Sequence, residues 1–369
     1  MKIDIAYYGL EWHGLWSGTL DVFHDRFSKC LGSTNVRMVS VFPKISKLYQ
    51  KMLVLYAHLF YTGHGICKEK FIYKKVVQTA LNKIKNSESE WVLMVAENYL
   101  TSDFPKAKKY ACYIDSDFIS VAAKSSNSRM LGYNFYVKNY IRYSKESYAN
   151  MDLIFTQNEW TKQAIIKEYK FASDRIFNVR FGINLEPYKG PKNYKNHLML
   201  IVLRRTNQKV KGLDIVIKAL PLIRKEIPDA RLAIVGNDFY KDVDGVDTYV
   251  DYPRSKTKEL FREASLYVMP SRNEPNGMTY LEALSNKTPF VALNRFAAPE
   301  FSNNGEWSFL CDTESPDELA SIIVEAFKKE TELESMGEKG QQFVINNYSW
   351  DKTISTMIKT MEDFKCKSH

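Results

Sequence analysis

Short apolar runs alternate with helix-forming stretches along almost the whole chain. Many of the runs are continuous, as expected for parallel strands that are buried on both faces of a sheet. This alternation predicts right-handed β–α–β units and doubly wound α/β sheets. Helices are expected over 213–226, just before Pro228, and over 350–364. The expected strands are 3–7, 36–41, 91–95, 110–114, 153–156 and 176–179, and then 198–203, 230–235, 266–269, 290–293 and 308–310.

The strands form two series, which predict two domains. A chain of 369 residues is also longer than one core usually serves. The break is expected at 186–196, because EPYKGPKNYKN is polar, contains Pro and Gly, and has no apolar periodicity. We therefore expect one domain over 1–185, a second over 186–349, and a C-terminal helix over 350–369 that packs back towards the first domain.

The composition excludes several classes of protein. Hydrophobic residues make up 45% of the chain, which is too many for a disordered protein. The five cysteines are scattered without a C-x-x-C pair, which argues against a zinc ribbon or a disulfide framework and suits a reducing cytoplasm. The beginning, MKIDIAYYG, does not resemble a signal peptide. No apolar stretch reaches the roughly 18–20 residues that span a bilayer. We expect a cytoplasmic protein, at most peripheral at a membrane.

The stretch PSRNEPNGMTYLEAL follows the predicted strand 266–269 and carries Glu274 and Glu282, with seven residues between them. Gly277 precedes a helix that is expected to begin near Met278. A glycine before a helix lets backbone N–H groups approach a phosphate, and the helix dipole favours negative charge there. Glu274 could bind sugar hydroxyls and Glu282 a ribose. Taken alone, such a pair is more often a solvated loop residue and a surface helix charge.

This stretch resembles the retaining nucleotide-sugar glycosyltransferases of family 4, marked by E-x7-E within a pattern like P-S-x-x-E-x-x-G-x-x-x-x-E-A. The similarity extends over 211–236, 288–293 and 349–353, and in the N-terminal half over MDLIFTQNEWTKQAI and VRFGIN. It implies the GT-B fold, with two Rossmann-like domains facing across a cleft. The acceptor would bind in 1–185 and the nucleotide-sugar donor in 186–349. The matching residues are Pro270, Ser271, Glu274, Gly277, Glu282 and Ala283.

The resemblance also implies roles for basic residues after the first strand of the second domain. The family binds the donor diphosphate there with an Arg and with the Lys of a Lys-Gly pair. Lys211 matches the lysine, and Arg205 is preferred for the arginine over its neighbour Arg204. Fixed cations stabilise a departing nucleoside diphosphate without a metal ion. No metal and no other cofactor is therefore expected, and the donor is a substrate.

The remaining donor contacts follow from the same resemblance. Glu274 would hold the donor sugar, Glu282 the ribose, and the backbone N–H groups of Met278 and Thr279 the phosphates. Asn276 stands where the family often has an aromatic residue or glycine, so the donor fit differs there. Residues 296–298 read Phe-Ala-Ala where the family tends to have glycines, which argues against a phosphate contact through N–H groups at that loop.

In the N-terminal half, GLEWHGLWSGTL follows the first strand. Family members place a glycine pair near the donor phosphates at this point, and Gly18 is the better match. Aromatic faces stack well on sugar rings, so Trp12, Trp16 and the neighbouring His13 are candidate acceptor contacts. Tryptophans that anchor the loop in the core explain the same residues equally well.

The stretch YIDSDF places Asp115 and Asp117 after the predicted strand 110–114. Two such carboxylates could bind Mn²⁺ or Mg²⁺, as in GT-A transferases. That class needs its donor site in the N-terminal half, whereas the donor pattern here is C-terminal. Family 4 enzymes often carry a sugar-binding histidine in this region, and this chain has none between residues 65 and 196. We interpret Asp115 as a candidate catalytic contact and Asp117 as a candidate acceptor contact.

Residues 44–85 contain nine lysines and one acidic residue, Glu69. The first part, 44–60, has apolar residues at helical spacing beside lysines. Such a helix can lie on an anionic membrane surface, as suits a lipid-linked acceptor. An ordinary helix packed on the sheet has the same pattern and ranks somewhat higher. Nucleic acid as acceptor ranks lower, because no known nucleic-acid module accompanies the charge.

The sequence therefore predicts a metal-independent retaining glycosyltransferase that moves a sugar from a nucleoside diphosphate to a hydroxyl of a glycan, glycolipid or other glycoconjugate. Three alternatives remain open: a metal-dependent GT-A enzyme that uses Asp115 and Asp117, a transferase acting on nucleic acid, and a degenerate binding protein. Glu274, Glu282 and Lys211 together argue against the last of these.

Overall fold

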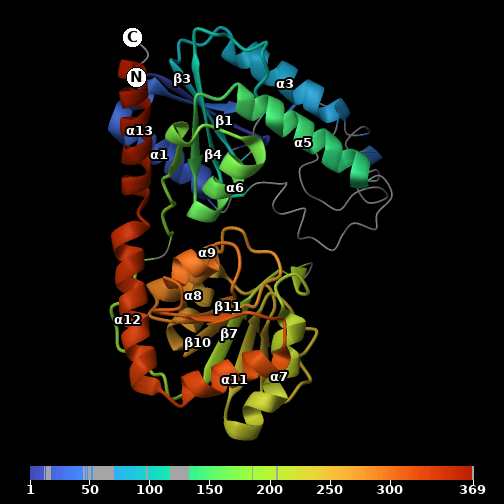
Figure 1. Cartoon of the computed structure of the whole chain (residues 1–369), viewed down its shortest axis with the longest axis vertical. Helices are drawn as coiled ribbons and strands as arrows, with labels where there is room; N and C mark the ends of the chain where they lie inside the picture. The colour runs from blue at the N-terminus through green and yellow to red at the C-terminus, as the bar shows by residue number, and fades with distance from the viewer. Residues whose placement is uncertain are drawn as a thin grey trace. The chain divides into compact units, whose positions relative to one another are not determined.

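The computed structural model describes residues 1–367 apart from 12, 14–17, 45, 47, 49–50, 53–69, 97–98, 117–132, 185 and 205–206. The chain divides into two compact units, Met1–Arg180 with Trp350–His369, and Phe181–Ser349. Each unit contains one parallel sheet with flanking helices (Figure 1). The expected doubly wound α/β architecture is thereby confirmed.

The sheet of the first unit has six strands among the described residues, in the order β2-β1-β3-β4-β5-β6, and all its pairs are parallel. β1 and β3 are buried along their whole length, which explains their unbroken apolar sequences. The strands are β1 Ile3–Tyr7, β2 Val36–Ser40, β3 Trp91–Val95, β4 Lys109–Ile114, β5 Leu153–Thr156 and β6 Ile176–Asn178.

Helices of both ends of the chain cover this first sheet. Helix α13 packs on α1, where Phe23 and Trp350 meet edge to face with ring centroids 5.6 Å apart. Further along α13, Phe364 contacts the ring of Trp91 in β3. The C-terminal helix therefore completes the core of the first unit. The helices are α1 Thr19–Leu31, α3 Lys70–Ile84, α5 Tyr133–Ala149, α6 Glu159–Tyr169 and α13 Trp350–Lys367, with short 3₁₀ turns at Ser33–Asn35 and Ser173–Arg175.

The sheet of the second unit also has six strands among the described residues, in the order β12-β11-β10-β7-β8-β9, again all parallel. Counted from β7, this is the order 3-2-1-4-5-6 with the direction of travel reversing between β7 and β10. Ligands of such sheets bind beyond the carboxyl ends of the strands at that reversal. The strands are β7 Leu198–Val202, β8 Arg231–Val235, β9 Val246–Tyr249, β10 Leu266–Val268, β11 Phe290–Leu293 and β12 Phe309–Cys311.

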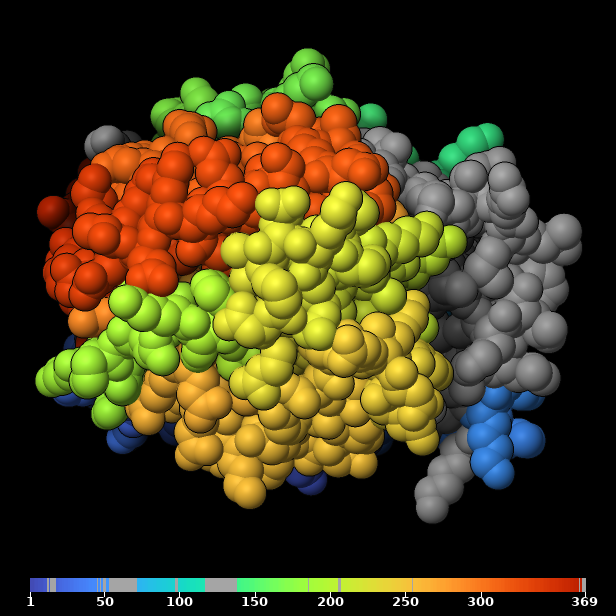
Figure 2. Space-filling view, turned by 90° about the horizontal axis from the view of Figure 1, so that it is seen from below, coloured from blue at the N-terminus to red at the C-terminus, as the bar shows by residue number. Residues whose placement is uncertain are grey.

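Helices α7 and α11 pack side by side in the second unit, and Figure 2 shows yellow α7 residues next to orange-red C-terminal residues of the same unit. Helix α12 packs on α9. Among the described residues, no helix is both long and apolar enough to cross a membrane. The helices are α7 Leu213–Glu226, α8 Arg254–Glu263, α9 Met278–Ser285, α10 Ala298–Ser302, α11 Pro316–Phe327 and α12 Glu330–Asn347.

Eleven of the observed strands match the predicted ranges to within one residue at either end. The strand that the sequence did not reveal is β9, at the edge of the second sheet beside β8. Its sequence VDTY is half-buried at all four positions, so it lacks the continuous apolar run that marks the other strands. Most of the predicted helix over 44–60 lies outside the described residues.

The polar segment 186–196 is held to the second unit by Lys192. The three N–H groups of its ammonium are shared among three backbone carbonyls and one hydroxyl, which belong to the ends of α8 and α9 and to the residues that follow α9. A positive charge is favourable at helix C-termini, so one lysine caps two helices. Burial lowers the pKa of Lys192 well below its usual value. The acceptors are Phe261 O at 2.9 Å, Arg262 O at 3.1 Å, Asn286 O at 3.3 Å and Thr288 Oγ1 at 2.5 Å.

Candidate functional site

The predicted donor residues of the second unit lie on the loops after β7 and β10, the two strands at the reversal of strand order. Lys211 ends the loop after β7, and Glu274 lies in the loop after β10. The Lys211 ammonium donates a hydrogen bond to Glu274 Oε2. Both side chains are largely buried, with 18% and 17% of their surface exposed. The structure thus brings together two candidates that the sequence could only name separately.

Glu274 is also bound to the start of the following helix. Its second oxygen, Oε1, accepts a hydrogen bond from the backbone N–H of Gly277 at 2.9 Å. Each carboxylate oxygen of Glu274 therefore has its own donor: the Lys211 ammonium for Oε2, and the N–H of the α9 N-cap residue Gly277 for Oε1. This arrangement fixes the carboxylate before any ligand arrives.

Two glycines make this close approach feasible. Gly212, directly after Lys211, has φ +78°, and a Cβ there would collide with the carbonyl oxygen of Pro270 in the β10 loop. Gly277 has φ +66°, and a Cβ there would collide with the ring of Tyr280. Left-handed backbone and missing Cβ atoms are both needed, so only glycine fits either place without strain. The Lys-Gly pair thus places Lys211 against the loop of Glu274.

The electrostatic setting of Lys211 is unusual for a lysine. Burial and, secondly, the charge of Arg204 lower its pKa to about 8. Arg204 is exposed and its backbone N–H donates to Asn207 Oδ1 at 2.9 Å, within the turn that leads to Lys211. Of the two candidate arginines, Arg204 therefore lies near the lysine. Arg205, the preferred candidate, lies outside the described residues.

The N-terminus of α9 offers further N–H groups beside the one that Glu274 binds. Its N-cap is Gly277, whose own N–H donates to Glu274 Oε1, and its first turn has no acidic residue. Met278 and Thr279 are the first two helical residues, so their N–H groups have no acceptor within the helix. A terminus of this kind attracts phosphate through its N–H groups and its dipole. Asn276, just before the cap, is half-buried.

Glu282 differs from an ordinary helix surface charge. It lies one turn into α9 and is only 7% exposed. Its charge contributes, after burial, to a raised pKa of the Tyr267 hydroxyl in β10. The interpretation of Glu282 as a solvated residue is therefore wrong, and a buried carboxylate near the sheet edge remains as a candidate ribose contact.

The loop after β11 lacks the glycines that the family tends to have. Phe296 nevertheless has φ +57°, in the left-handed region where glycine is usual. Its side chain is 6% exposed and belongs to the core of the unit. Packing of the ring offsets the backbone strain, so this loop has a glycine-like conformation without glycine.

Arg272, which the sequence analysis did not single out, links the loops that carry Lys211 and Glu274. It forms a bidentate pair with Asp214 in the first turn of α7, at 2.7 and 3.0 Å. Its Nε donates to Glu314 at 2.7 Å. These partners lie 58 and 42 positions away along the chain, so no local pattern could have revealed them.

In the first unit, Asp115 directly follows β4 at the carboxyl edge of the sheet and is half-buried. Burial raises its pKa, which the Ser116 hydroxyl opposes by donating to Oδ1 at 3.1 Å. Thr161 at the start of α6 donates to the Asp115 carbonyl at 2.9 Å. The backbone of Asp115 is thus fixed between two elements. Asp117 lies outside the described residues.

The loop before α1 is described only in part. Gly18 caps α1 with φ +83°, and a Cβ there would meet no atom of the described residues within 4 Å. His13 is largely exposed and its Nδ1 lies 2.8 Å from Asp21 Oδ1 in the first turn of α1. Trp12 and Trp16 lie outside the described residues.

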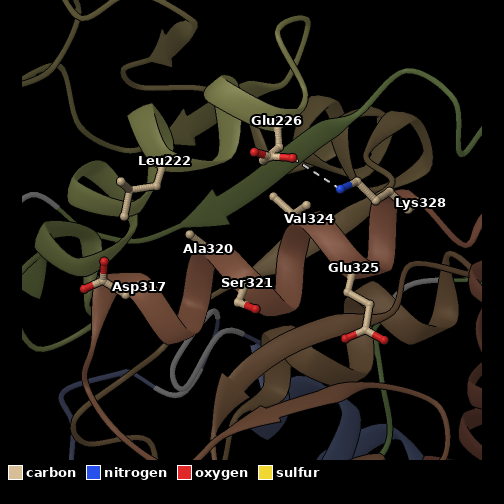
Figure 3. Close-up of a pocket in the computed structure, with 8 residues that line it drawn as sticks. All are labelled: Leu222, Glu226, Asp317, Ala320, Ser321, Val324, Glu325 and Lys328. Atoms are coloured by element: carbon tan, nitrogen blue, oxygen red, sulfur yellow. Dashed lines mark hydrogen bonds and ion pairs between the residues drawn. The ribbon is translucent and has the colours of Figure 1, made fainter.

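A surface groove between α7 and α11 contains none of the predicted site residues. Figure 3 shows Leu222 and Glu226 of α7 facing side chains of α11, with an ion pair of 3.4 Å between Glu226 and Lys328. The groove lies on the helical layer and not at the carboxyl edge of the sheet. Its remaining lining residues are Asp317, Ala320, Ser321, Val324 and Glu325.

Comparison with known proteins agrees with the geometry of the second unit. Residues 186–343 match the family described as "Glycosyl transferases group 1". A GDP-mannose-dependent alpha-(1-6)-phosphatidylinositol monomannoside mannosyltransferase of Mycolicibacterium smegmatis is 28% identical over 158 residues, which cover 38% of this chain and 41% of that protein. Matches to this relative and to spore coat protein SA of Bacillus subtilis span 41% and 64% of the length of those proteins.

Solved structures resemble the chain over nearly its whole length. The sucrose-phosphate synthase of Thermosynechococcus elongatus has a TM-score of 0.72 at 12% identity, covering 99% of this chain and 100% of that one. The Anabaena protein HepE in complex with UDP has a TM-score of 0.66 at 16% identity, covering 98% and 100%. The two parallel sheets are therefore those of the GT-B fold, and residues 186–343 form a glycosyltransferase domain of group 1, consistent with family 4.

Proposed function

We propose that the protein is a metal-independent, retaining glycosyltransferase that moves a sugar from a nucleoside diphosphate to an acceptor hydroxyl. The observation that carries the proposal is the Lys211–Glu274 pair at the N-terminus of α9. A solved neighbour of this fold was crystallised with UDP and glucose, which agrees with a nucleotide-sugar donor. The donor is proposed to bind in 186–349 and the acceptor in 1–185.

In the proposed reaction, negative charge develops on the departing diphosphate. The Lys211 ammonium, an arginine at 204 or 205 and the N–H groups of Met278 and Thr279 would together stabilise that charge. Fixed dipoles and cations stabilise a transition state strongly, because they need no reorganisation during the reaction. Glu274 would hold donor hydroxyls and Glu282 the ribose. Retention then follows if the leaving phosphate assists the incoming hydroxyl on the same face.

In the first unit, we propose that Gly18 contacts the donor phosphates and that Asp115 contacts the reacting sugar. The proposed acceptor contacts are Trp12, His13, Trp16 and Asp117. The acceptor is proposed to be a glycan or a lipid-linked molecule. For a lipid-linked acceptor, the lysine-rich segment 44–85 would contact an anionic membrane surface.

The test is a thermal-shift screen of nucleoside diphosphates and their sugars against the full chain in EDTA. A specific hit raises the melting temperature by mass action and names the donor. Lys211→Met should reduce the shift clearly, whereas the exposed Lys189→Met should keep it. A shift that appears only with added Mn²⁺ would overturn metal independence and favour the GT-A alternative. Absence of any nucleotide effect, with and without metal, would overturn the proposal as a whole.

A further inference from the structure

Four charged side chains form a continuous chain of ion pairs across the second unit. Asp214 binds Arg272 through both carboxylate oxygens, at 2.7 and 3.0 Å. Arg272 Nε binds Glu314 Oε2 at 2.7 Å. The other Glu314 oxygen, Oε1, accepts from Arg295 Nη1 at 3.2 Å. The order Asp214–Arg272–Glu314–Arg295 thus alternates in sign without a gap.

The four residues of this ion-pair network follow four different strands at the carboxyl edge of the sheet. Asp214 is in the first turn of α7, which follows β7, and Arg272 follows β10. Arg295 follows β11 and Glu314 follows β12. These strands are consecutive neighbours in the order β12-β11-β10-β7. The ion-pair network therefore links the connections that follow four adjacent strands. Three of these connections carry the candidate donor residues or the glycine-like turn at Phe296.

Backbone contacts extend the linkage to Lys211. Arg272 Nη1 donates to the carbonyl of Lys209, and its backbone N–H donates to the carbonyl of Val210 at 2.8 Å. The Ser271 hydroxyl reaches the same Val210 carbonyl at 3.1 Å. The two residues directly before Lys211 are thereby bound to Ser271 and Arg272, which lie three and two positions before Glu274. Hydrogen bonds to the charged side chain raise the pKa of Arg272 further, so the guanidinium keeps its charge.

We propose that Arg272 is a positioning residue that holds the Lys211 loop against the Glu274 loop, and that Glu314 transmits this constraint to the loop after β11. The inference rests on the proposed function only in that these loops bind the donor. Arginine suits the task, because its planar fork binds Asp214 with two donors while Nε binds Glu314. Lysine offers a single charged point and cannot bridge these partners in the same way.

Loss of an Arg272 ion pair should displace Lys211 more than it lowers the stability of the fold. The side chains of Arg272, Asp214 and Glu314 are 28%, 32% and 39% exposed, so solvent screens each pair. Loss of one pair should change the melting temperature little. A small displacement of Lys211 from the leaving group, in contrast, can lower the rate by roughly a hundred-fold.

The experiment compares Arg272→Lys with Arg224→Lys in the full chain. Arg224 is a matched control, because it also binds one carboxylate, Asp244, and one carbonyl, Ala230, each at 2.8 Å. Those partners precede β9 and β8, at the opposite edge of the same sheet. The first measurement needs no donor: amine acylation of Lys211 is followed by mass spectrometry as a function of pH. The second is the dissociation constant of the nucleoside diphosphate that the thermal-shift screen finds.

In Arg272→Lys, the Lys211 loop should be held less tightly and Lys211 should become more hydrated, although the backbone bond to Val210 remains. The midpoint of Lys211 acylation should therefore move to higher pH, because desolvation lowers the pKa of Lys211 less. Nucleotide affinity should fall roughly ten- to a hundred-fold. Arg224→Lys should leave both unchanged. An unchanged acylation midpoint in Arg272→Lys overturns the positioning role, even if nucleotide binding is lost.

Two further outcomes separate this inference from the proposed function. A wild-type chain that binds no nucleoside diphosphate refutes the function, while the acylation shift still decides on Arg272. Should Arg272→Lys not fold, Glu314→Gln takes its place, because it weakens the bridge between Arg272 and Arg295 while the guanidinium of Arg272 stays in place. Its acylation midpoint should move in the same direction, and no movement overturns the inference.

Discussion

The ammonium of Lys211 donates a hydrogen bond to the carboxylate of Glu274 across 63 positions of sequence. The contact spans the place where the strand order of the second sheet reverses, because Lys211 follows β7 and Glu274 follows β10. A cation, a carboxylate and a helix N-terminus are therefore held together at this edge of the sheet. Preorganisation of this kind is what stabilisation of a developing diphosphate charge needs.

The first prediction concerns Glu274. Glu274→Gln keeps an oxygen that can accept from the Gly277 N–H, but it removes the charge that pairs with Lys211 and binds donor hydroxyls. Transfer of the sugar should fall by roughly a hundred-fold or more, since a charged contact at the reacting sugar is lost. Turnover is measured with the donor found by thermal shift. Glu259→Gln, an exposed change on α8 in the same unit, should leave turnover intact. Equal turnover of the Glu274 variant would remove this residue from the site.

The second prediction is a pH dependence that follows from the lowered pKa of Lys211, about 8. Below that value the ammonium is charged and can bind a diphosphate, and above it the amine is neutral. Nucleotide affinity should therefore weaken as pH rises through 8, by about tenfold per pH unit once the amine is neutral. Calorimetric titration at several pH values measures this fall in affinity.

Two variants of Lys211 test whether this residue causes the fall in affinity near pH 8. Lys211→Arg stays charged throughout, so its affinity should show no fall near pH 8. Lys211→Met should bind roughly ten- to a hundred-fold more weakly than the wild type at pH 7, since one charge-assisted hydrogen bond is lost. A fall near pH 8 that persists in Lys211→Met would belong to another group.

The sequence predicted the strands well, because parallel strands buried on both faces must be apolar along their whole length. It failed at β9, where an edge position relaxes that demand and VDTY carries no signal. Glu274, Gly277 and Lys211 were found through a motif, but their mutual contact depends on sheet order, which local patterns do not encode. Arg272, Glu314 and Arg295 were missed for the same reason: their pairing exists only once the loops are adjacent.

The third prediction concerns Gly212. In Gly212→Ala, the Cβ would collide with the Pro270 carbonyl in addition to the cost of a left-handed alanine. The left-handed backbone costs about 1–2 kcal/mol, and the collision should add about 1–3 kcal/mol. Urea unfolding measures the loss. Gly305→Ala is the matched control, since φ is +96° but the nearest atom to a Cβ is 3.8 Å away. Equal losses in both variants would show that the loops do not need this close approach.

The last prediction concerns Lys192, which lies far from the proposed chemistry. Its ammonium supplies four acceptors at the ends of α8 and α9, and burial lowers its pKa well below the usual value. Lys192→Met keeps much of the apolar stem but removes the ammonium. The Arg262 carbonyl then loses this donor, while the Thr288 hydroxyl still donates to Phe261 O and lies 3.3 Å from Asn286 O, so the second unit should be destabilised by about 1–3 kcal/mol. Hydrogen exchange should show the loss at the C-terminal turns of α8 and α9. Lys189→Met, an exposed change three residues earlier in the same segment, should alter stability by no more than about 0.5 kcal/mol. Undiminished protection of both helix ends in Lys192→Met would mean that water replaces the ammonium, and that the segment 186–196 is held by its tyrosines instead.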